Sequence, residues 1–101
     1  MIIYNITTKV HHGIAAEWLQ WLKDVHTKDV MESDCFTEFK ILKLLEVDED
    51  EGPTYAVQFF AESKALYNRY IEKFAGEMRN RSFDKWGEKF ISIRSVMQIV
   101  D

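Results

Sequence analysis

The stretch TYAVQFFA, residues 54–61, is the clearest indication of the fold of this 101-residue chain. It is a nearly continuous apolar run interrupted only by Gln58, which is typical of a strand covered on both faces. The acidic segment DEDEGP at 48–53 precedes it and predicts a turn. A second apolar stretch at 36–47 is expected to pair with it as a hairpin strand. In that strand we expect two faces, with Phe39, Ile41, Leu45 and Val47 opposite Phe36, Leu42 and Leu44.

Helical periodicity flanks the hairpin on both sides. On the N-terminal side, spacings of three and four residues predict a helix with the apolar stripe Ile14, Trp18, Trp21, Leu22 and Val25. Thr27 is a candidate cap, so this helix is expected to bend or restart near His26. On the C-terminal side, Ser63 is expected to cap a second helix, with Gly76 as a kink or stop and Gly87 as the end. Its predicted stripe is Leu66, Tyr67, Tyr70, Ile71, Phe74 and Met78.

Apolar strands also begin and end the chain, at 1–10 and at 90–100. The first strand is expected to carry Ile2, Tyr4, Ile6 and Val10 on one face and Ile3 on the other face. In the last, Ile91, Ile93, Met97 and Ile99 alternate with Phe90, Ser92, Arg94, Val96 and Gln98. The resulting order β-α-β-β-α-β predicts a single α+β domain, 1–101, of the ferredoxin-like class. We expect a four-stranded antiparallel sheet with two helices on one face and the first and third strands central.

The second face of this sheet also carries large apolar side chains on every strand. Leaving roughly eight of them in water would forfeit about 1.5–3 kcal/mol each, which rivals the stability of a small domain. A second copy of the same face is the simplest cover, because a two-fold contact needs only one evolved surface. The sequence therefore predicts a homodimer formed through the open sheet face.

Composition restricts the classes of partner. The formal net charge of -4 and the pI of about 5.3 oppose a nucleic acid partner, whose phosphates require clustered positive charge. No apolar run approaches ~20 residues, and no N-terminal segment has the pattern of a signal peptide, so neither a membrane partner nor export is expected. The single cysteine, Cys35, cannot form an internal disulfide, which favours a reduced, cytoplasmic location.

Stretches from the whole chain also resemble a known family. They are MIIYNIT at the start, EWLQWL at 17–22 followed by His26 and DVM at 29–31, TYAVQFF at 54–60, and GEKF at 87–90 with Arg94. In these residues the chain resembles an uncharacterised bacterial family, a domain of unknown function grouped with dimeric α/β-barrel proteins. The resemblance implies a ferredoxin-like fold and a face-to-face dimer, and it implies no activity. Asp34 and Cys35 stand where it implies a glycine-containing turn, and Lys28 where a proline is more usual.

The candidate site lies at the first helix. His26 beside Trp18 and Trp21 could contact a ligand or act as a general base in a groove between helix and sheet. The alternative is a structural histidine that caps the helix end or hydrogen-bonds a neighbour. Tyr4 and Tyr55 are expected to add aromatic lining. Arg94 interrupts an apolar strand and needs a partner, either a ligand anion or, as the favoured alternative, a carboxylate within the protomer or at the dimer interface.

Other polar clusters have plainer interpretations. His11 and His12 supply two ligand atoms without the further ligands of a zinc site, and segment 46–51 lacks the ligand spacing of a calcium loop. We therefore expect no metal site and no cofactor, and Cys35 has no neighbour that would activate it.

Three functions remain. The favoured one is a small-molecule-binding or regulatory module for a flat, mostly apolar or aromatic ligand. The alternative is an enzyme resembling cofactor-independent monooxygenases, with a histidine positioning a small phenolic substrate, and this rests on fold-level analogy. RNA binding through the sheet is disfavoured by the acidic charge and by the predicted dimer.

Overall fold

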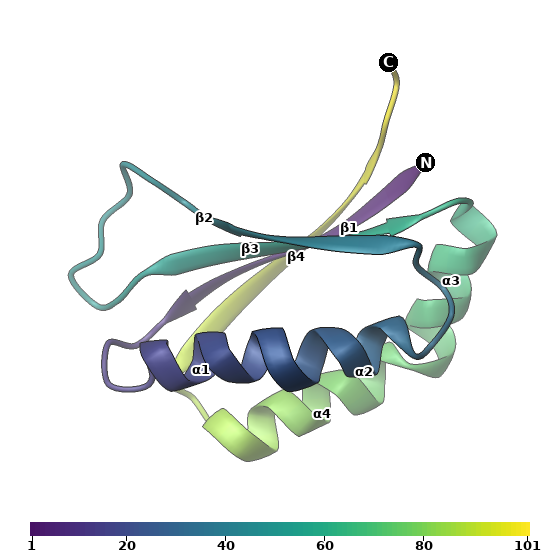
Figure 1. Cartoon of the computed structure of the whole chain (residues 1–101). Coiled ribbons are helices and arrows are strands. Elements are labelled where there is room, and N and C mark those ends of the chain that lie inside the picture. The colour runs from purple at the N-terminus through teal and green to yellow at the C-terminus, as the bar shows by residue number, and fades with distance from the viewer.

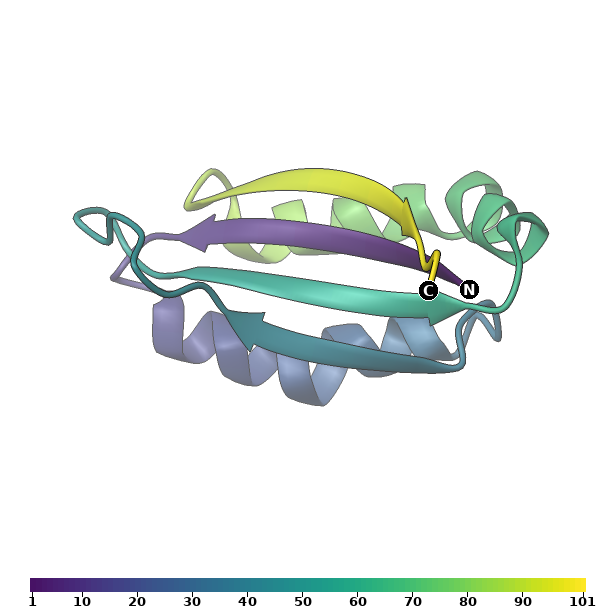
Figure 2. The same cartoon turned by 90° about the horizontal axis from the view of Figure 1, so that it is seen from above.

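The computed structural model describes residues 1–101, and its four strands form one antiparallel sheet (Figure 1). The strands are β1 (Ile2–Val10), β2 (Glu38–Lys43), β3 (Thr54–Ala61) and β4 (Phe90–Gln98). Their order is β2-β3-β1-β4, so β1 and β3 are the inner strands and β2 and β4 are the edges (Figure 2).

Two helical stretches lie on the same side of this sheet, as Figure 1 shows. The first consists of α1 (Ala15–Trp21), the π-helical turn η1 (Leu22–His26) and α2 (Thr27–Met31). The second consists of α3 (Lys64–Lys73) and α4 (Ala75–Trp86). The predicted α+β architecture, an antiparallel four-stranded sheet with helices on one face, is confirmed. None of these helices combines the length and the apolar character needed to cross a membrane.

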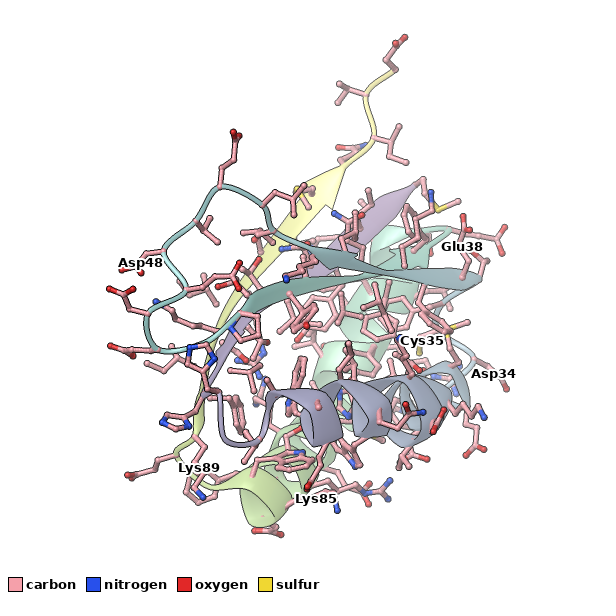
Figure 3. All side chains as sticks on the ribbon, turned by 60° about the vertical axis from the view of Figure 1, so that its left-hand side comes forward. Asp34, Cys35, Glu38, Asp48, Lys85 and Lys89 are labelled. Atoms are coloured by element: carbon pink, nitrogen blue, oxygen red, sulfur yellow. The ribbon has the colours of Figure 1, made fainter.

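An aromatic cluster joins the sheet to the helices. Tyr4 on β1 lies opposite Phe59 on β3, and both point toward the helical layer. Their rings contact those of Phe36 and Tyr70, with centroid distances of 4.9 Å for Phe36–Tyr70 and 5.3 Å for Phe36–Phe59. Figure 3 shows side chains filling most of the layer between sheet and helices. Rings packed at these distances add specific geometry to the burial of a large apolar area, so this cluster fixes the spacing of the two layers.

The first helical stretch continues past His26 without the predicted restart. The backbone N–H of Thr27 donates to the carbonyl of Leu22, five residues earlier, which defines the π-helical turn. Thr27 is therefore not a cap: it is fully buried, and its hydroxyl donates to the carbonyl of Lys23 at 3.1 Å. The extra residue in this turn also corrects the predicted stripe, because Val25 turns outward and is 44% exposed. The buried positions are instead Trp18, Leu22, Thr27 and Val30.

The second helical stretch begins and ends where the sequence predicts. The Ser63 hydroxyl accepts a hydrogen bond from the backbone N–H of Leu66 at 3.2 Å, which confirms it as the N-cap. Gly87 follows the last helical residue with a positive φ of 63°. The predicted kink at Gly76 is wrong, since the interruption falls at Phe74, with φ of -124° and ψ of -34°. A rotation there turns Ala75 and Met78, the buried residues of α4, toward the sheet.

The hairpin is shorter than predicted on its first strand. β2 pairs with β3 only from Glu38 to Lys43, because the chain leaves the sheet after it, and Glu46 has a positive φ of 58°. Leu45 is consequently 75% exposed instead of lying on a strand face. Phe36, predicted on the second face of the strand, precedes β2 and is buried in the helix-facing core.

Two turns show strong backbone constraints. Asp34 has a positive φ of 60°, so the turn after α2 keeps a glycine-like conformation although an aspartate occupies it. At Gly52, a Cβ atom would lie 1.7 Å from the carbonyl oxygen of Val10, which only glycine avoids. This close approach lets the carbonyl oxygen of Pro53 accept a hydrogen bond from the backbone N–H of Val10 at 2.9 Å.

The opposite sheet face is uncovered in the protomer (Figure 2). Ile91 and Ile93 on β4 are 67% and 69% exposed, and Leu42 on β2 is also exposed. These three side chains lie on the helix-free face. Side chains alternate between the two faces along a strand, and the residues paired with these three stand next to the residues that face the helices. Polar Thr7 and Gln58 lie on that face as well, so it is mixed rather than wholly apolar.

We expect Phe59→Ala to lower the free energy of unfolding by about 3–5 kcal/mol, because it opens a cavity beneath the aromatic cluster. The matched control is Phe83→Ala on α4, where the ring is 57% exposed and the expected loss is below about 1 kcal/mol. Urea unfolding followed by circular dichroism, at one protein concentration, measures both. Equal losses in the two variants would contradict the assigned core.

Candidate functional site

A cavity of ≈ 70 Å³ lies between the helices and the sheet, and it contacts β1, β3, β4, the first helical stretch, α3 and α4. Five of the six predicted site residues line it, namely Tyr4, Trp18, Trp21, His26 and Arg94. The sixth, Tyr55, is outside the lining and stacks on the ring of Trp18, with centroids 5.8 Å apart. The groove interpretation of His26 requires an open space beside the imidazole, and the structure contains one.

Helix α4 lines the cavity with residues that were not predicted from the sequence. Ala75, Met78, Arg79 and Ser82 line the cavity from this helix. Their spacings of three, one and three residues place them on one helical face. The signal was present in the sequence, because Met78 belongs to the predicted stripe and Arg79 and Ser82 flank it.

The aromatic walls of the cavity are supported from behind. Trp18 lies against Tyr55 in a stacked arrangement, with an interplanar angle of 28°. Trp21 meets Trp86 edge to face, with centroids 5.9 Å apart and an angle of 74°. A ring packed against a second ring loses freedom to rotate into an adjacent space, so these contacts help to keep the cavity open.

His26 faces the cavity because of the π-helical turn. In such a turn, residues five apart lie above one another, and the His26 ring stacks on that of Trp21 at 4.9 Å and 28°. No protein group hydrogen-bonds the imidazole, and the residue lies inside a continuous helical stretch, so neither form of the structural interpretation is met. Burial lowers the pKa of His26 to about 4, against the opposing effect of the Asp29 carboxylate, so the ring is neutral at pH 7.

Arg94 has a different partner from the one favoured by the sequence. Its Nε donates a hydrogen bond to the hydroxyl of Tyr4 at 3.2 Å, and no carboxylate of the protomer pairs with it. The expected salt bridge within the protomer is therefore wrong. Burial raises the pKa of Tyr4, although the nearby charge of Arg94 opposes this, and burial likewise raises the pKa of Tyr70. Both phenols remain protonated near neutral pH.

The remaining polar candidates lie away from this cavity. His11 accepts a hydrogen bond at Nδ1 from the backbone N–H of Gly13 at 2.9 Å, in an exposed turn with His12. No group of three or more His, Cys, Asp or Glu side chains is placed to hold a metal ion. The thiol of Cys35 is buried, and its Sγ donates to the carbonyl of Ser33 at 3.6 Å. Of the histidines, the arginine and the cysteine singled out in the sequence, only His26 and Arg94 thus border this largely apolar cavity.

The sequence profile of a family described as a domain of unknown function (DUF4286) matches residues 1–100. The chain belongs to this family. No curated protein matches the sequence significantly. Membership in this family confirms the resemblance seen in the sequence, and the function has to be inferred from the cavity itself.

Solved structures similar to this family member share its fold across nearly the whole chain. A dimeric ferredoxin-like protein from an uncultured marine organism has a TM-score of 0.73 and 16% identity, with 100% of this chain and 96% of that chain covered. A putative antibiotic biosynthesis monooxygenase from Deinococcus radiodurans has a TM-score of 0.72 and 9% identity, with 100% of this chain and 94% of that chain covered. A mutant of the cofactor-independent oxygenase SnoaB from Streptomyces nogalater has a TM-score of 0.68 and 10% identity, with 99% of this chain and 94% of that chain covered. Identities this low show a common ferredoxin-like fold and leave activity open.

We expect His26 to make the folded protein less stable in mild acid. Because its pKa falls from 6.5 to about 4 on folding, the unfolded chain binds a proton between these pH values while the folded protein does not. Stability therefore rises with pH across this window, and His26 should cost about 2 kcal/mol at pH 5 relative to pH 8.

Urea unfolding at pH 8 and pH 5 measures this difference. His26→Gln should remove that part of the pH dependence, because glutamine does not titrate. The control variant His12→Gln, in the exposed turn, should retain the behaviour of the unmodified protein. An unchanged pH dependence in His26→Gln would refute the buried, neutral state of the imidazole.

Proposed function

We propose that this protein is a homodimeric module that binds a small molecule in the cavity beside His26. The observation that carries the proposal is an open space faced by a neutral imidazole that no protein group hydrogen-bonds. His26 is half-buried, and neither of its ring nitrogens has a protein partner, so the imidazole can hydrogen-bond a ligand or water in the cavity. The aromatic walls on either side suit the apolar body of a ligand.

The size of the cavity limits its occupant. Its volume of ≈ 70 Å³ is roughly half of the ~150 Å³ that holds benzene in an engineered apolar cavity. A ligand of a few non-hydrogen atoms therefore enters without rearrangement, whereas a fused aromatic ring system requires displacement of the Trp18 or Trp21 wall. The support of these rings by Tyr55 and Trp86 makes such displacement costly.

A fragment library tests ligand binding, read out as chemical-shift changes in ¹H–¹⁵N NMR spectra. We expect binders whose shifts centre on His26 and Ser82. Ser82→Phe should abolish this binding, because Ser82 lines the cavity and a phenyl group fills it. Asn80→Phe, at an exposed position of the same helix, should leave binding unchanged. A library without binders, or binders unaffected by Ser82→Phe, would refute the proposed binding site.

The dimer is proposed to form through the open sheet face. Ile91 and Ile93 expose most of their surface there, and Met97 of the same strand and Leu42 of β2 are exposed as well. A contact of standard size buries about 800 Å² per partner, and covering this face would recover the apolar burial that the protomer lacks. The marine protein of similar fold is described as dimeric, which supports the same assembly here.

Light scattering coupled to gel filtration should give twice the chain mass of 12.0 kDa. Ile93→Lys should shift the protein to the monomer, because it places a charge within the proposed interface. Leu45→Lys, on the exposed hairpin loop, should leave the dimer intact. A monomeric parent protein at micromolar concentration would contradict this interface.

Oxygenation of a small aromatic substrate is the second candidate, supported by a histidine and a tyrosine in an aromatic cavity. The lowered pKa of His26 weighs against it, because an imidazole with a pKa of about 4 is a poor general base near neutral pH. The two candidates differ in a direct measurement: an oxygenase consumes O₂ in proportion to the loss of a small phenolic substrate, and a binding module does not.

A further inference from the structure

The cavity carries the opposite charge to the protein as a whole. The chain has a formal net charge of -4, yet none of the 17 residues lining the cavity is an aspartate or a glutamate. Two arginines, Arg79 from α4 and Arg94 from β4, are among them, and both are exposed as well as lining the cavity. They therefore mark its opening to solvent with positive charge.

These two arginines lack the partners that a neighbouring arginine has. Arg81, two residues after Arg79 on α4, forms ion pairs with Glu77 at 2.7 Å and with Asp29 at 3.2 Å. Arg79 and Arg94 form no ion pair within the protomer, whose remaining salt bridge is Lys43–Glu49. The guanidinium of Arg94 uses only its Nε, in the bond to Tyr4, so its terminal nitrogens keep their N–H donors. The cavity opening thus has unused positive donors.

The polar groups next to these guanidiniums can also donate. Because the Tyr4 hydroxyl accepts from Arg94 Nε, its own hydrogen is left for another acceptor. Ser82 and Tyr70 line the same space, and neither hydroxyl takes part in a side-chain hydrogen bond. A neutral His26 supplies one further N–H. These groups together offer several hydrogen-bond donors, and no carboxylate lies among them. Such a site suits an oxyanion.

We propose that the ligand is a small carboxylic acid, bound as its carboxylate. Arg94 and Arg79 hold the carboxylate at the opening, and the apolar body of the acid lies between Trp18 and Trp21. A planar guanidinium group can donate two parallel hydrogen bonds to the two oxygens of a carboxylate. This geometry favours a carboxylate over an anion with a single charged atom. The inference rests on the proposed function and names its ligand class.

The apolar lining separates a carboxylic acid from an inorganic anion. Eleven of the 17 lining residues are hydrophobic, and nine of these lack a hydroxyl group, so about half of the cavity wall offers little to the oxygens of phosphate or sulfate. The ≈ 70 Å³ volume suits the three-carbon apolar body of a small branched acid such as isobutyrate, because the carboxylate stays at the opening. Inorganic phosphate has the charge without the apolar body and serves as a comparison.

The test is an NMR titration with isobutyrate, with its uncharged amide isobutyramide and with inorganic phosphate. We expect isobutyrate to bind at least about tenfold more tightly than isobutyramide, since a hydrogen bond to a charged group is worth about this factor. Phosphate should bind more weakly than isobutyrate. Arg94→Gln and Arg79→Gln should each weaken isobutyrate binding severalfold, whereas Arg69→Gln, at an exposed α3 position outside the cavity, should not.

Each contrary outcome has a defined meaning. Equal affinities for isobutyrate and isobutyramide would overturn the carboxylate assignment while leaving the cavity as a binding site. Weakening by Arg69→Gln to the same degree would overturn it too, because general charge would then explain the effect. Absence of cavity shifts with isobutyrate would also overturn it, and the Ser82→Phe test with the fragment library separately decides whether the cavity binds anything.

Discussion

The packing of aromatic rings around Tyr4 holds the helical layer against the sheet. The ring of Tyr4 lies within 5.6–6.4 Å of four others, those of Phe36, Phe59, Tyr67 and Tyr70, which join an inner strand to the second helical stretch. Its hydroxyl meanwhile anchors Arg94 at the edge of the cavity. One side chain therefore sets both the separation of the two layers and the position of a charged group, so packing and the candidate site are physically coupled.

Much of the fold follows from local patterns in the sequence. The strand Thr54–Ala61 and the Ser63 cap were predictable, because an apolar run bounded by turn residues and a hydroxyl before a helical stripe each have one favourable arrangement. The helix interruption was not, since its position at Phe74 depends on how two helical faces meet the sheet. Glycine propensity alone pointed to Gly76, and tertiary packing overrode it.

The candidate site was predictable in its residues but not in its geometry. Trp18, Trp21 and His26 were identified from their types and proximity in the chain. The π-helical turn that directs His26 inward leaves no trace in apolar periodicity, because Val25 fits the ordinary stripe equally well. Arg79 was missed for a related reason: whether a charged residue beside a buried stripe faces a cavity or solvent is decided by the neighbouring layer.

The alternation along β4 has a consequence for how this family can vary. Ile91 and Ile93 face away from the helices while Ser92 and Arg94 face the cavity, so adjacent residues serve opposite sides of one edge strand. Inserting or deleting a single residue upstream within β4 would exchange the two sets and send a guanidinium to the wrong face. The exposed part of the loop between β2 and β3, ahead of the anchored Gly52, can change length without this cost, whereas the length of the chain from Gly87 to Arg94 is tightly restricted.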